Sequence, residues 1–305
     1  MDVLVVNAGS TSLKLHLVRR GDSEPVDGFV PADAVGHRVV HGGDLAEPRL
    51  VDNDLEEVVE RLSVLAPLHN RPALEAMRRA RAALPDVPHV AVFDTAFHRT
   101  MPEPASTYAV PERWRTDWGV RRYGFHGISV QWVASRVRVL RLVVCHLGGG
   151  SSITAVKDGC SVDTTMGFSP LEGVPMATRS GSVDPGALVY LLREGLVDTA
   201  GLEHALEHES GLAGLSGGGS GDAREASPLA LDVYVHRVAA AVAAMTAACG
   251  GLDALAFTGG IGEHATAVRE RIVERVRFLG DFRVEVVRAR EELVIAAETE
   301  RLLAK

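Results

Sequence analysis

The sequence predicts an α/β fold built from two similar halves, and three observations support this. Short runs of β-branched residues alternate with helix-like stretches rich in Ala, Leu and Arg, which is typical of helices packed on largely buried sheets. A pattern of apolar strand, small polar turn and second apolar strand occurs once in each half. With 305 residues, the chain is long enough for two domains or one large one.

The individual elements follow from the apolar runs and their spacing. We expect strands, in chain order, over residues 3–6, 37–40, 89–93, 141–147 and 254–257. We expect helices over residues 54–65, 72–83, 185–195 and 229–248. The glycine-rich segment 210–222 has two interpretations, a flexible loop or a backbone shaped to approach a ligand.

The two repeated patterns predict β-hairpins whose turns face a ligand. Residues 4–18 read LVVNAGSTSLKLHLV and residues 143–156 read VVCHLGGGSSITAV. A third glycine turn, at 257–264, follows the last expected strand. Turns of Gly, Ser and Thr present backbone N–H groups and hydroxyls, which suit phosphate oxygens. We therefore interpret these turns as a phosphate-binding site, with ordinary tight turns as the alternative.

Composition excludes several classes of function. A formal net charge of -8, with no run rich in Lys or Arg, argues against nucleic acid or an anionic membrane as partner. No apolar run approaches the roughly 18 residues needed to span a bilayer, and the first residues lack the basic region of a secretory signal. The three cysteines form no C-x-x-C pair. We expect a cytoplasmic protein.

Longer motifs run through the chain in a fixed order: NAGSTSLK, HRVVHGG, LAPLHN, VFDTAFH, RRYGFHG, CHLGGGSS, MGFSPLEGVPMATRSGSVDPG, FTGGIGEH and REELVIAAET. Together they resemble the acetate kinase family, within the acetate and sugar kinase, heat-shock protein 70 and actin superfamily. The resemblance implies a duplicated ribonuclease H-like (actin-like ATPase) fold, with two domains around a nucleotide cleft. It implies a discontinuous first domain of residues 1–97 plus 288–305, and a second of residues 98–287 carrying nucleotide and dimer contacts.

The same resemblance implies ATP-dependent phosphorylation of acetate to acetyl phosphate by direct, reversible in-line transfer. ATP and ADP would be the nucleotides and Mg²⁺ the metal, with Mn²⁺ as a substitute. No general base is required, because a carboxylate is already ionised at neutral pH. The difficulty is repulsion between an anionic nucleophile and an anionic phosphoryl group, so the site should supply cations and aligned donors.

Four residues match the family's catalytic positions. Arg38 in HRVVHGG and Arg179 in MATRSG match the arginines that hold the substrate carboxylate and the phosphoryl group, and a guanidinium can bind either anion bidentately. His126 in YGFHG resembles the histidine that donates to the phosphoryl group. Asp94, directly after the strand 89–93, resembles an acidic residue near the metal and the phosphates.

The resemblance also implies an acyl pocket and a metal site. On the substrate side, the matching residues are Arg38, Val40, Leu68, His69, Phe125 and Pro170. The narrow Val40 favours acetate, although one methylene is worth only about 1–3 kcal/mol of discrimination. Asn7 and Glu291 match the metal side, with the adjacent Glu292 as the alternative. Carboxylates suit Mg²⁺, which usually takes only one or two from a protein. We interpret His37 and His41 as structural.

Residues matching the family's nucleotide positions gather mainly in the glycine-rich motifs. They are Ser12, Lys14, His146, Gly148, Gly149, Gly150, Asp222, Arg224, Gly260, Ile261 and Gly262. The chain departs from the family at Gly149 and at His264, where the family has Asn. Glycine at 149 removes one phosphate-side amide, which predicts weakened catalysis. The chain is also shorter than typical members between Lys14 and Arg38.

Other functions were weighed against this interpretation. GLSGG at 214–218 fits the nucleophile elbow of α/β-hydrolases, with Ser216 as nucleophile, but it follows a helix-like stretch instead of a strand. A kinase for another acyl acceptor such as propionate, and a catalytically weak ATP-binding regulatory relative, remain as alternatives. Retention of both arginines, His126 and the acidic residues favours catalysis. The resemblance favours a homodimer.

Overall fold

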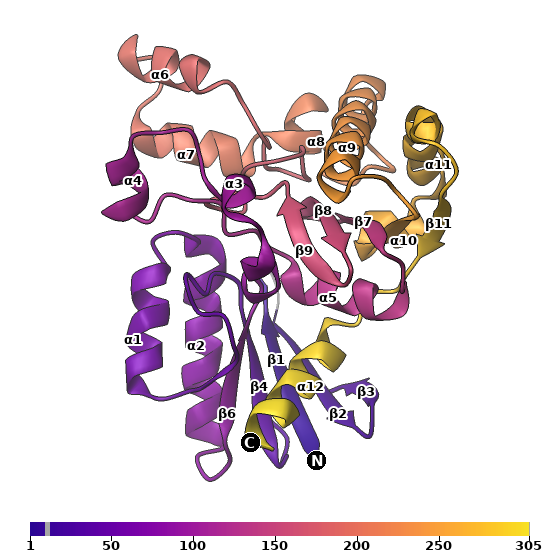
Figure 1. Ribbon diagram of the computed structural model, residues 1–305. Coiled ribbons are helices and arrows are strands. Elements are labelled where there is room, and N and C mark those ends of the chain that lie inside the picture. The colour runs from indigo at the N-terminus through magenta and orange to yellow at the C-terminus, as the bar shows by residue number, and fades with distance from the viewer. Residues whose placement is uncertain (10–12, 305) are drawn as a thin grey trace. The chain divides into compact units, whose positions relative to one another are not determined.

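The structure is a computed structural model that describes residues 1–9 and 13–304. The chain divides into two compact units, each with its own sheet (Figure 1). Unit 1 comprises Met1–Arg99, Tyr123–Trp132 and the C-terminal segment from Arg290. Unit 2 comprises Thr100–Arg122 and Val133–Ala289.

The sheet of unit 1 has the strand order β3-β2-β1-β4-β6-β5. Its strands are β1 (Asp2–Ala8), β2 (Leu13–Arg19), β3 (Asp22–Pro25), β4 (Ala34–Val39), β5 (Arg49–Leu50) and β6 (His89–Phe93). The first three form an antiparallel meander, whereas β4 pairs parallel with both β1 and β6. The carboxyl ends of β1, β4 and β6 therefore lie at one edge of the sheet, where ligands of such sheets bind.

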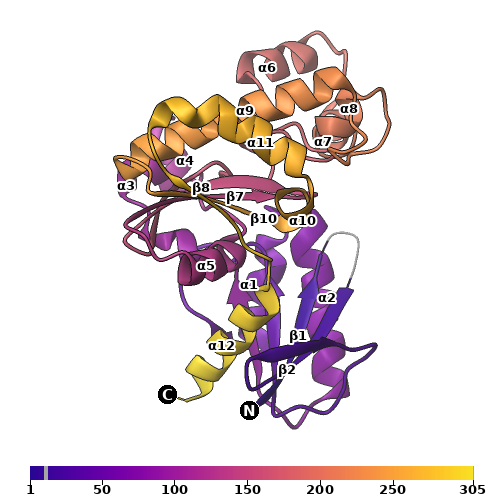
Figure 2. The same cartoon turned by 90° about the vertical axis from the view of Figure 1, so that its right-hand side faces the viewer.

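Helices cover both faces of this sheet, because its central strands are apolar on both sides. Val3 and Val5 pack against α12 (Glu291–Leu303) and the start of α5 (Gly127–Arg136). Leu4 and Val6 point the other way and pack against α2 (Pro67–Ala83). Figure 2 shows α12 and α2 on opposite sides of β1 and β2. The neighbouring α1 (Asn53–Leu62) completes the α2 layer.

Unit 2 holds a sheet of order β11-β10-β7-β8-β9. Its strands are β7 (Arg141–Leu147), β8 (Ser151–Lys157), β9 (Cys160–Thr164), β10 (Ala254–Thr258) and β11 (Arg283–Val286). β7, β8 and β9 form an antiparallel meander, and β10 pairs parallel with β7 and β11. This is the same succession of pairings as β1, β2, β3, β4 and β6, so the predicted duplicated fold is confirmed.

Most helices of unit 2 are short, and α9 is the longest of them. They are α3 (Glu103–Ser106), α4 (Glu112–Thr116), α6 (Pro185–Arg193), α7 (Thr199–His208), α8 (Gly211–Leu215), α9 (Pro228–Cys249), α10 (Gly259–His264) and α11 (Thr266–Val276). Single 3₁₀ turns occur at Ala96–Thr100, in the chain entering unit 2, and at Arg277–Leu279.

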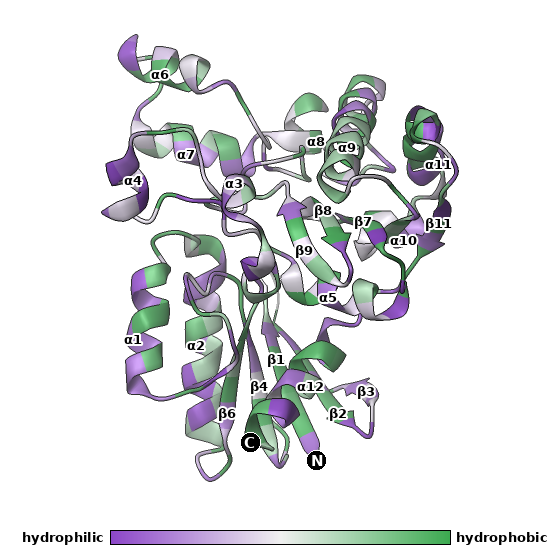
Figure 3. Cartoon of the chain, viewed as in Figure 1, coloured by the Kyte–Doolittle hydropathy of each residue, from purple (hydrophilic) through white to green (hydrophobic). Residues whose placement is uncertain are grey.

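Helix α9 is long and apolar enough, by length and composition, to cross a membrane. Its sequence, mostly hydrophobic in Figure 3, instead serves the core of unit 2. Tyr234, Val238 and Val242 are fully buried in a cluster with residues of β7, β8, β10 and α11. Ser227 accepts from the Ala230 N–H at its start, and Gly250 ends it with φ +75°. We therefore assign α9 as a core helix.

The expected strands and helices are all present, but three sequence expectations are wrong in detail. Residues 259–264 form helix α10 instead of a turn, and Gly259 at φ +80° lets the chain pass close to the Leu147 carbonyl. Segment 210–222 is not wholly a loop, since its first part is α8. Residues 123–132, expected in the second domain, belong to unit 1. Ile128 packs there in the core, and the Gly127 N–H donates to the Asp94 carbonyl at 3.0 Å.

Candidate active site

Unit 1 brings four of the predicted site residues together at the carboxyl ends of its parallel strands. The Arg38 guanidinium donates from Nη2 to Asp94 Oδ2 at 2.6 Å and from Nε to both carboxylate oxygens at 3.2 Å. Its Nη1 donates to Asn7 Oδ1 at 3.2 Å and lies 3.5 Å from Glu291 Oε2. Asn7 Nδ2 donates to the same Glu291 oxygen at 3.0 Å. Residues from β1, β4, β6 and α12 thus form one connected network.

The network is largely removed from water. The Asp94 side chain is fully buried, and those of Arg38 and Glu291 are only 13% and 16% exposed. Burial alone would lower the pKa of Arg38, but the two carboxylates raise it above its ordinary value, so the guanidinium stays charged. Burial raises the pKa of Asp94, while Arg38 and the backbone N–H of His126 act in the opposite direction. Because Asp94 occupies one edge of the guanidinium, Arg38 has a fixed orientation.

His126 follows this network in a strained backbone conformation. Its φ is +59°, a region that non-glycine residues seldom adopt. The next residue must be glycine, because a Cβ at Gly127 would lie 2.0 Å from the Asp94 carbonyl oxygen. The strained residue lies directly before α5, and its backbone N–H forms a hydrogen bond with Asp94. Strained residues of this kind cluster at functional sites.

The predicted acyl-pocket residues of unit 1 lie on segments that are tied to one another. Asn70 Nδ2 donates to the His41 carbonyl at 2.9 Å, and the His41 N–H donates to Asn70 Oδ1 at 2.9 Å. These bonds join the chain after Val40 to the start of α2, which carries Leu68 and His69. The His41 ring meets Phe125 edge-on, with 5.3 Å between ring centroids. Val40 and Phe125 are buried, which suits an apolar pocket.

His37 and His41 do not share a site. His37 Nε2 and His89 Nδ1 are 2.9 Å apart, and His89 Nε2 lies 2.9 Å from the Leu84 carbonyl, which can only accept. His89 therefore carries its proton on Nε2, and His37 donates to it. Burial lowers the pKa of His37 to about 3. His41 Nδ1 instead accepts from the Gly43 N–H at 3.0 Å.

The first hairpin is confirmed, although part of its turn is not described. Asn7 on β1 stands opposite Lys14 on β2, and directly opposed residues of an antiparallel pair project from the same face. Lys14 is therefore placed beside the Arg38 network. The predicted phosphate ligand Ser12, with Ser10 and Thr11, lies outside the described residues.

Unit 2 brings its own glycine motifs together. In the hairpin turn between β7 and β8, the Gly148 N–H donates to the Gly150 carbonyl at 2.9 Å. A Cβ at Gly148 would lie 3.7 Å from the Gly260 nitrogen, at the start of α10. The turn and α10 are therefore neighbours, with His146 on β7, Ile261 and Gly262 beside them. Apart from the adjoining backbone, no atom of the described residues lies within 4 Å of a Cβ position at Gly149 or Gly260, so this backbone is open to a ligand.

Gly149 does not need glycine for its conformation. Its φ is outside the positive range found at many other glycines of the chain. A Cβ at 149 has open space around it and the backbone does not require glycine, which makes the departure from the family directly testable.

Ala177 is a meeting point of unit 2 that the sequence did not reveal. Its N–H donates to the Gly149 carbonyl at 3.3 Å, and its own carbonyl accepts from the Ala213 N–H of α8 at 2.9 Å. A Cβ at Gly221 would lie 2.9 Å from Ala177 Cβ. Contacts at one alanine thus link the turn between β7 and β8 to α8 and to the segment preceding Asp222. An alanine carries no chemical signal that could have predicted this.

Asp222 and Arg224 pair with each other on the surface. Arg224 Nε lies 2.9 Å from Asp222 Oδ1, and the Arg224 N–H donates to the same oxygen at 2.9 Å. These bonds lower the pKa of Asp222 to about 2. The Arg224 side chain is 65% exposed, so it is accessible to a nucleotide. The pair is too exposed to contribute much to stability.

Arg179 is held by the backbone instead of by a carboxylate. Its Nη1 donates to the Pro170 carbonyl at 2.7 Å, and Pro170 is itself buried. Within the described part of unit 2, no carboxylate oxygen lies within ion-pair distance of this guanidinium. Burial lowers the pKa of Arg179, with the more distant Glu207 opposing this. A half-buried cation held by a neutral carbonyl is well suited to bind an anion.

Glu263 was also missed by sequence reasoning. It lies in FTGGIGEH, directly before His264. Its Oε1 accepts from the Gly259 N–H at 3.2 Å and from the Ala289 N–H at 2.9 Å. Ala289 is the last residue of unit 2 before the chain enters unit 1. Glu263 therefore joins the start of α10 to the segment that leads to Glu291.

The residues at the Arg38 network fit a magnesium ion by their chemistry. Asn7 and Glu291 offer amide and carboxylate oxygens, and Mg²⁺ favours one or two carboxylates together with water and substrate phosphates. Among residues 1–9 and 13–304, no group of three or more His, Cys, Asp or Glu side chains is placed to hold a metal alone. A site of this kind would bind metal together with a phosphate ligand.

Comparisons with known proteins agree with this arrangement. The model of the acetokinase family matches residues 30–302. A protein named acetate kinase from Protochlamydia amoebophila (strain UWE25) is 47% identical over 262 residues, covering 81% of this chain and 66% of that protein. The chain thus spans just under two thirds of the length of this relative.

Two solved structures share the fold over almost their entire length. A propionate kinase from Francisella tularensis subsp. tularensis SCHU S4 has a TM-score of 0.90 and 32% identity, covering 97% of this chain and 98% of its own. The acetate kinase of Porphyromonas gingivalis has a TM-score of 0.87 and 31% identity, with 99% of each chain covered. With the motifs, the duplicated sheets and the family match in agreement, the chain belongs to the acetokinase family.

Proposed function

We propose that this protein transfers the γ-phosphoryl group of ATP to acetate, giving acetyl phosphate and ADP in a reversible reaction. The observation that carries the proposal is the network in which Asp94 fixes Arg38 beside Asn7 and Glu291. A guanidinium oriented by a buried carboxylate presents its remaining N–H groups in a defined direction. Such a group can hold a carboxylate or a phosphoryl oxygen without rearranging during the reaction.

The chain's residues divide the work by chemistry. Arg38 and Arg179 offset the repulsion between the two anionic reactants, and His126 donates to the phosphoryl group. Val40, Leu68 and Phe125 enclose the methyl group of acetate, with His69 and Pro170 as further pocket residues. No side chain needs to remove a proton from acetate, because the carboxylate is already the nucleophile.

Nucleotide and metal are assigned to separate residues. The backbone is open at Gly149 and Gly260, and we propose that residues 148–150 and 260–262 bind the phosphates and let the nucleoside approach closely. Asp222 and Arg224 are proposed on the adenosine side, and Lys14 near the phosphates. Asn7 and Glu291 would hold Mg²⁺, which neutralises phosphate charge when bound.

Propionate is the second candidate substrate, because the Francisella structure with a TM-score of 0.90 is named a propionate kinase. Val40 is buried at 3% exposure, so its side chain limits the space beside it. Val40→Ala should raise the ratio of kcat/KM for propionate to that for acetate by a few-fold to about 100-fold. Steady-state kinetics with both acids measure this ratio, and a ratio that stays fixed would show that Val40 does not line the acyl site.

A homodimer is proposed through the helix α6 region. Among its described residues, α6 buries none, and Val189 and Tyr190 are 58% and 50% exposed. Leu196, just after it, is 64% exposed. An apolar helix left in water is commonly a subunit interface. We propose the cytoplasm as the location of the protein.

The decisive experiment is an acyl-phosphate assay with ATP and Mg²⁺, in which hydroxylamine traps the product. Acetate, propionate and butyrate are compared, and ADP release is measured in parallel. We expect acetyl hydroxamate and ADP in equal amounts, with acetate the best substrate. Binding of ATP with no acyl phosphate from any of the three acids would overturn the proposal in favour of a regulatory role.

A further inference from the structure

We propose that Arg122, Tyr108 and Glu172 act as positioning residues that set the place of Pro170 and, through its carbonyl, of Arg179. The inference rests on the proposed function and adds a clamp to it, defined as these three side chains. All of the residues concerned belong to unit 2. The clamp holds the segment 164–172, which connects β9 to the loop that carries Arg179.

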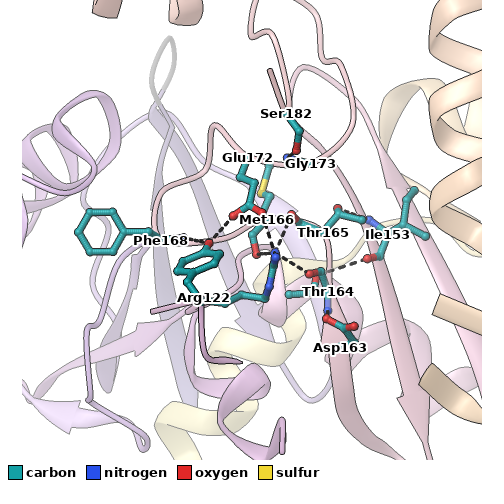
Figure 4. A network of polar contacts seen from close by, with 11 residues as sticks. Arg122, Ile153, Asp163, Thr164, Thr165, Met166, Phe168, Glu172, Gly173 and Ser182 are labelled. Carbon is teal, nitrogen blue, oxygen red and sulfur yellow. Dashed lines mark hydrogen bonds and ion pairs between the residues drawn. The ribbon is translucent and has the colours of Figure 1, made fainter. Parts of the chain in front are cut away.

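Arg122 binds the segment through its backbone. Its Nη1 donates to the carbonyls of Thr164, Thr165 and Met166 at 2.9, 2.9 and 3.1 Å. Its Nη2 donates to Glu172 Oε1 at 2.9 Å, at the far end of the same segment. Figure 4 shows the guanidinium pointing toward these residues. One side chain therefore closes both ends of a nine-residue loop, counted from 164 to 172.

Tyr108 contacts the middle of the segment at Phe168 and connects it to Glu172 at the end. The Tyr108 hydroxyl donates to Glu172 Oε2 in a short hydrogen bond and accepts from the Phe168 N–H at 3.0 Å. Burial and the Glu172 carboxylate raise the pKa of Tyr108, so the phenol stays protonated. The Arg122 guanidinium lies over the Tyr108 ring, 5.5 Å from its centroid.

The clamp is in direct contact with the backbone that it holds. A Cβ at Gly167 would lie 1.6 Å from Glu172 Oε2 and 2.0 Å from Tyr108 Oη, so only glycine fits. A cavity of about 650 Å³ is lined by Arg122, Thr165 and Glu172 among others. Close packing therefore does not fix this side of the segment, and polar contacts must do so.

The position of Pro170 is passed on to Arg179 by two sets of bonds. The Pro170 carbonyl accepts from Arg179 Nη1 at 2.7 Å. Two backbone bonds close the loop 173–182, which carries Arg179. The Ser182 N–H donates to the Gly173 carbonyl at 2.8 Å, and the Met176 N–H donates to the Arg179 carbonyl at 3.0 Å. A shift of the segment thus moves the anchor of the guanidinium. Misplacement of a reacting group by about 1 Å can cost about 10²-fold in rate.

Conservative variants separate positioning from folding. Tyr108→Phe removes only the hydroxyl, and Arg122→Lys keeps the charge but cannot serve three carbonyls and a carboxylate from one plane. Arg141→Lys is the matched control. The Arg141 guanidinium likewise binds a carboxylate, that of Asp253, but Arg141 lies at the start of β7, and the glycine turn follows the other end of this strand. We expect kcat/KM for acetate to fall about tenfold in Tyr108→Phe and up to about 10²-fold in Arg122→Lys. The Kd for ADP should stay within about twofold in both, and Arg141→Lys should match the wild type.

A second readout keeps this result separate from the proposed function. Amide hydrogen exchange in the peptide covering Phe168 should be faster in Tyr108→Phe than in the wild type and in Arg141→Lys. If the wild type forms no acyl phosphate, the proposed activity fails, while exchange still decides whether the clamp exists. Unchanged exchange in Tyr108→Phe would overturn the clamp. So would equal losses of acetate turnover and ADP affinity, because they would indicate general loosening of unit 2.

Discussion

Arg38 and Arg179, the two arginines of the proposed site, are held in opposite ways. Arg38 is bound by the Asp94 carboxylate and lies 3.5 Å from Glu291, so the charge around it is more than balanced. Arg179 is bound to a neutral carbonyl, and burial lowers its pKa where carboxylates raise that of Arg38. The difference suits Arg38 to the part of an oriented donor in the proposed reaction, and suits Arg179, which is held by a neutral group, to offer its positive charge to an anion.

The first prediction removes the charge balance at Arg38. Asp94→Asn leaves a buried guanidinium without its main counter-ion, so the free energy of unfolding should fall by about 3–5 kcal/mol. Urea unfolding measures it. The matched control is Glu47→Gln, which loses an exposed ion pair with Arg301 and should cost less than about 1 kcal/mol. Similar losses in the two variants would show that Asp94 does not balance Arg38.

The second prediction concerns Arg179, which is bound to the Pro170 carbonyl. Arg179→Ala should lower turnover at least about 10²-fold, the scale of removing a donor to the transition state. Its Tm should change far less than that of Asp94→Asn, because the group left behind by Arg179→Ala is the neutral Pro170 carbonyl, whereas Asp94→Asn leaves a charged guanidinium. Steady-state kinetics and thermal unfolding test both halves. A folded variant with unchanged turnover would remove Arg179 from the site.

The sequence could predict what is local. Apolar runs and glycine turns marked β1, β2, β7 and β8, because hairpins depend on neighbouring residues. The motifs marked Arg38, Asp94, Asn7 and Glu291, and the structure joins all four. What sequence reasoning missed depends on backbone carbonyls brought together by the fold. Arg122 binds three carbonyls and Ala177 joins two segments through its peptide groups, and neither contact has a residue-type signature.

Gly149 shows the same limit from the other side. The sequence flagged it as a departure, but whether glycine was required there depended on φ and on the space around it. The structure shows an ordinary φ and no atom within 4 Å of a Cβ. The backbone does not require glycine at position 149. Glycine in place of the expected asparagine therefore changes the chemistry of the turn by removing one amide donor.

The third prediction restores that donor. Gly149→Asn should raise kcat/KM for acetate by up to about 10²-fold if the new hydrogen bond forms mainly in the transition state. The variant should fold normally, because the site is open. A rise in activity would show that the site of the natural protein lacks one neutral donor. The charge of Arg179 would then provide a larger share of the transition-state stabilisation there. A folded variant with equal or lower activity for every acyl substrate would indicate a loop rebuilt for another purpose.

The last prediction tests the strand that carries Arg38. His37 is fully buried, and its pKa is lowered from 6.5 to about 3, so the folded state holds it neutral while the unfolded chain binds a proton below 6.5. Between these values the unfolded state binds more protons, and stability must therefore fall as the pH falls, by at most about 1.4 kcal/mol per pH unit for one histidine. His37→Leu should reduce this slope in urea unfolding between about pH 5 and 6, whatever its stability at neutral pH. An unaltered slope in His37→Leu would mean that the acid sensitivity of the protein arises at other groups.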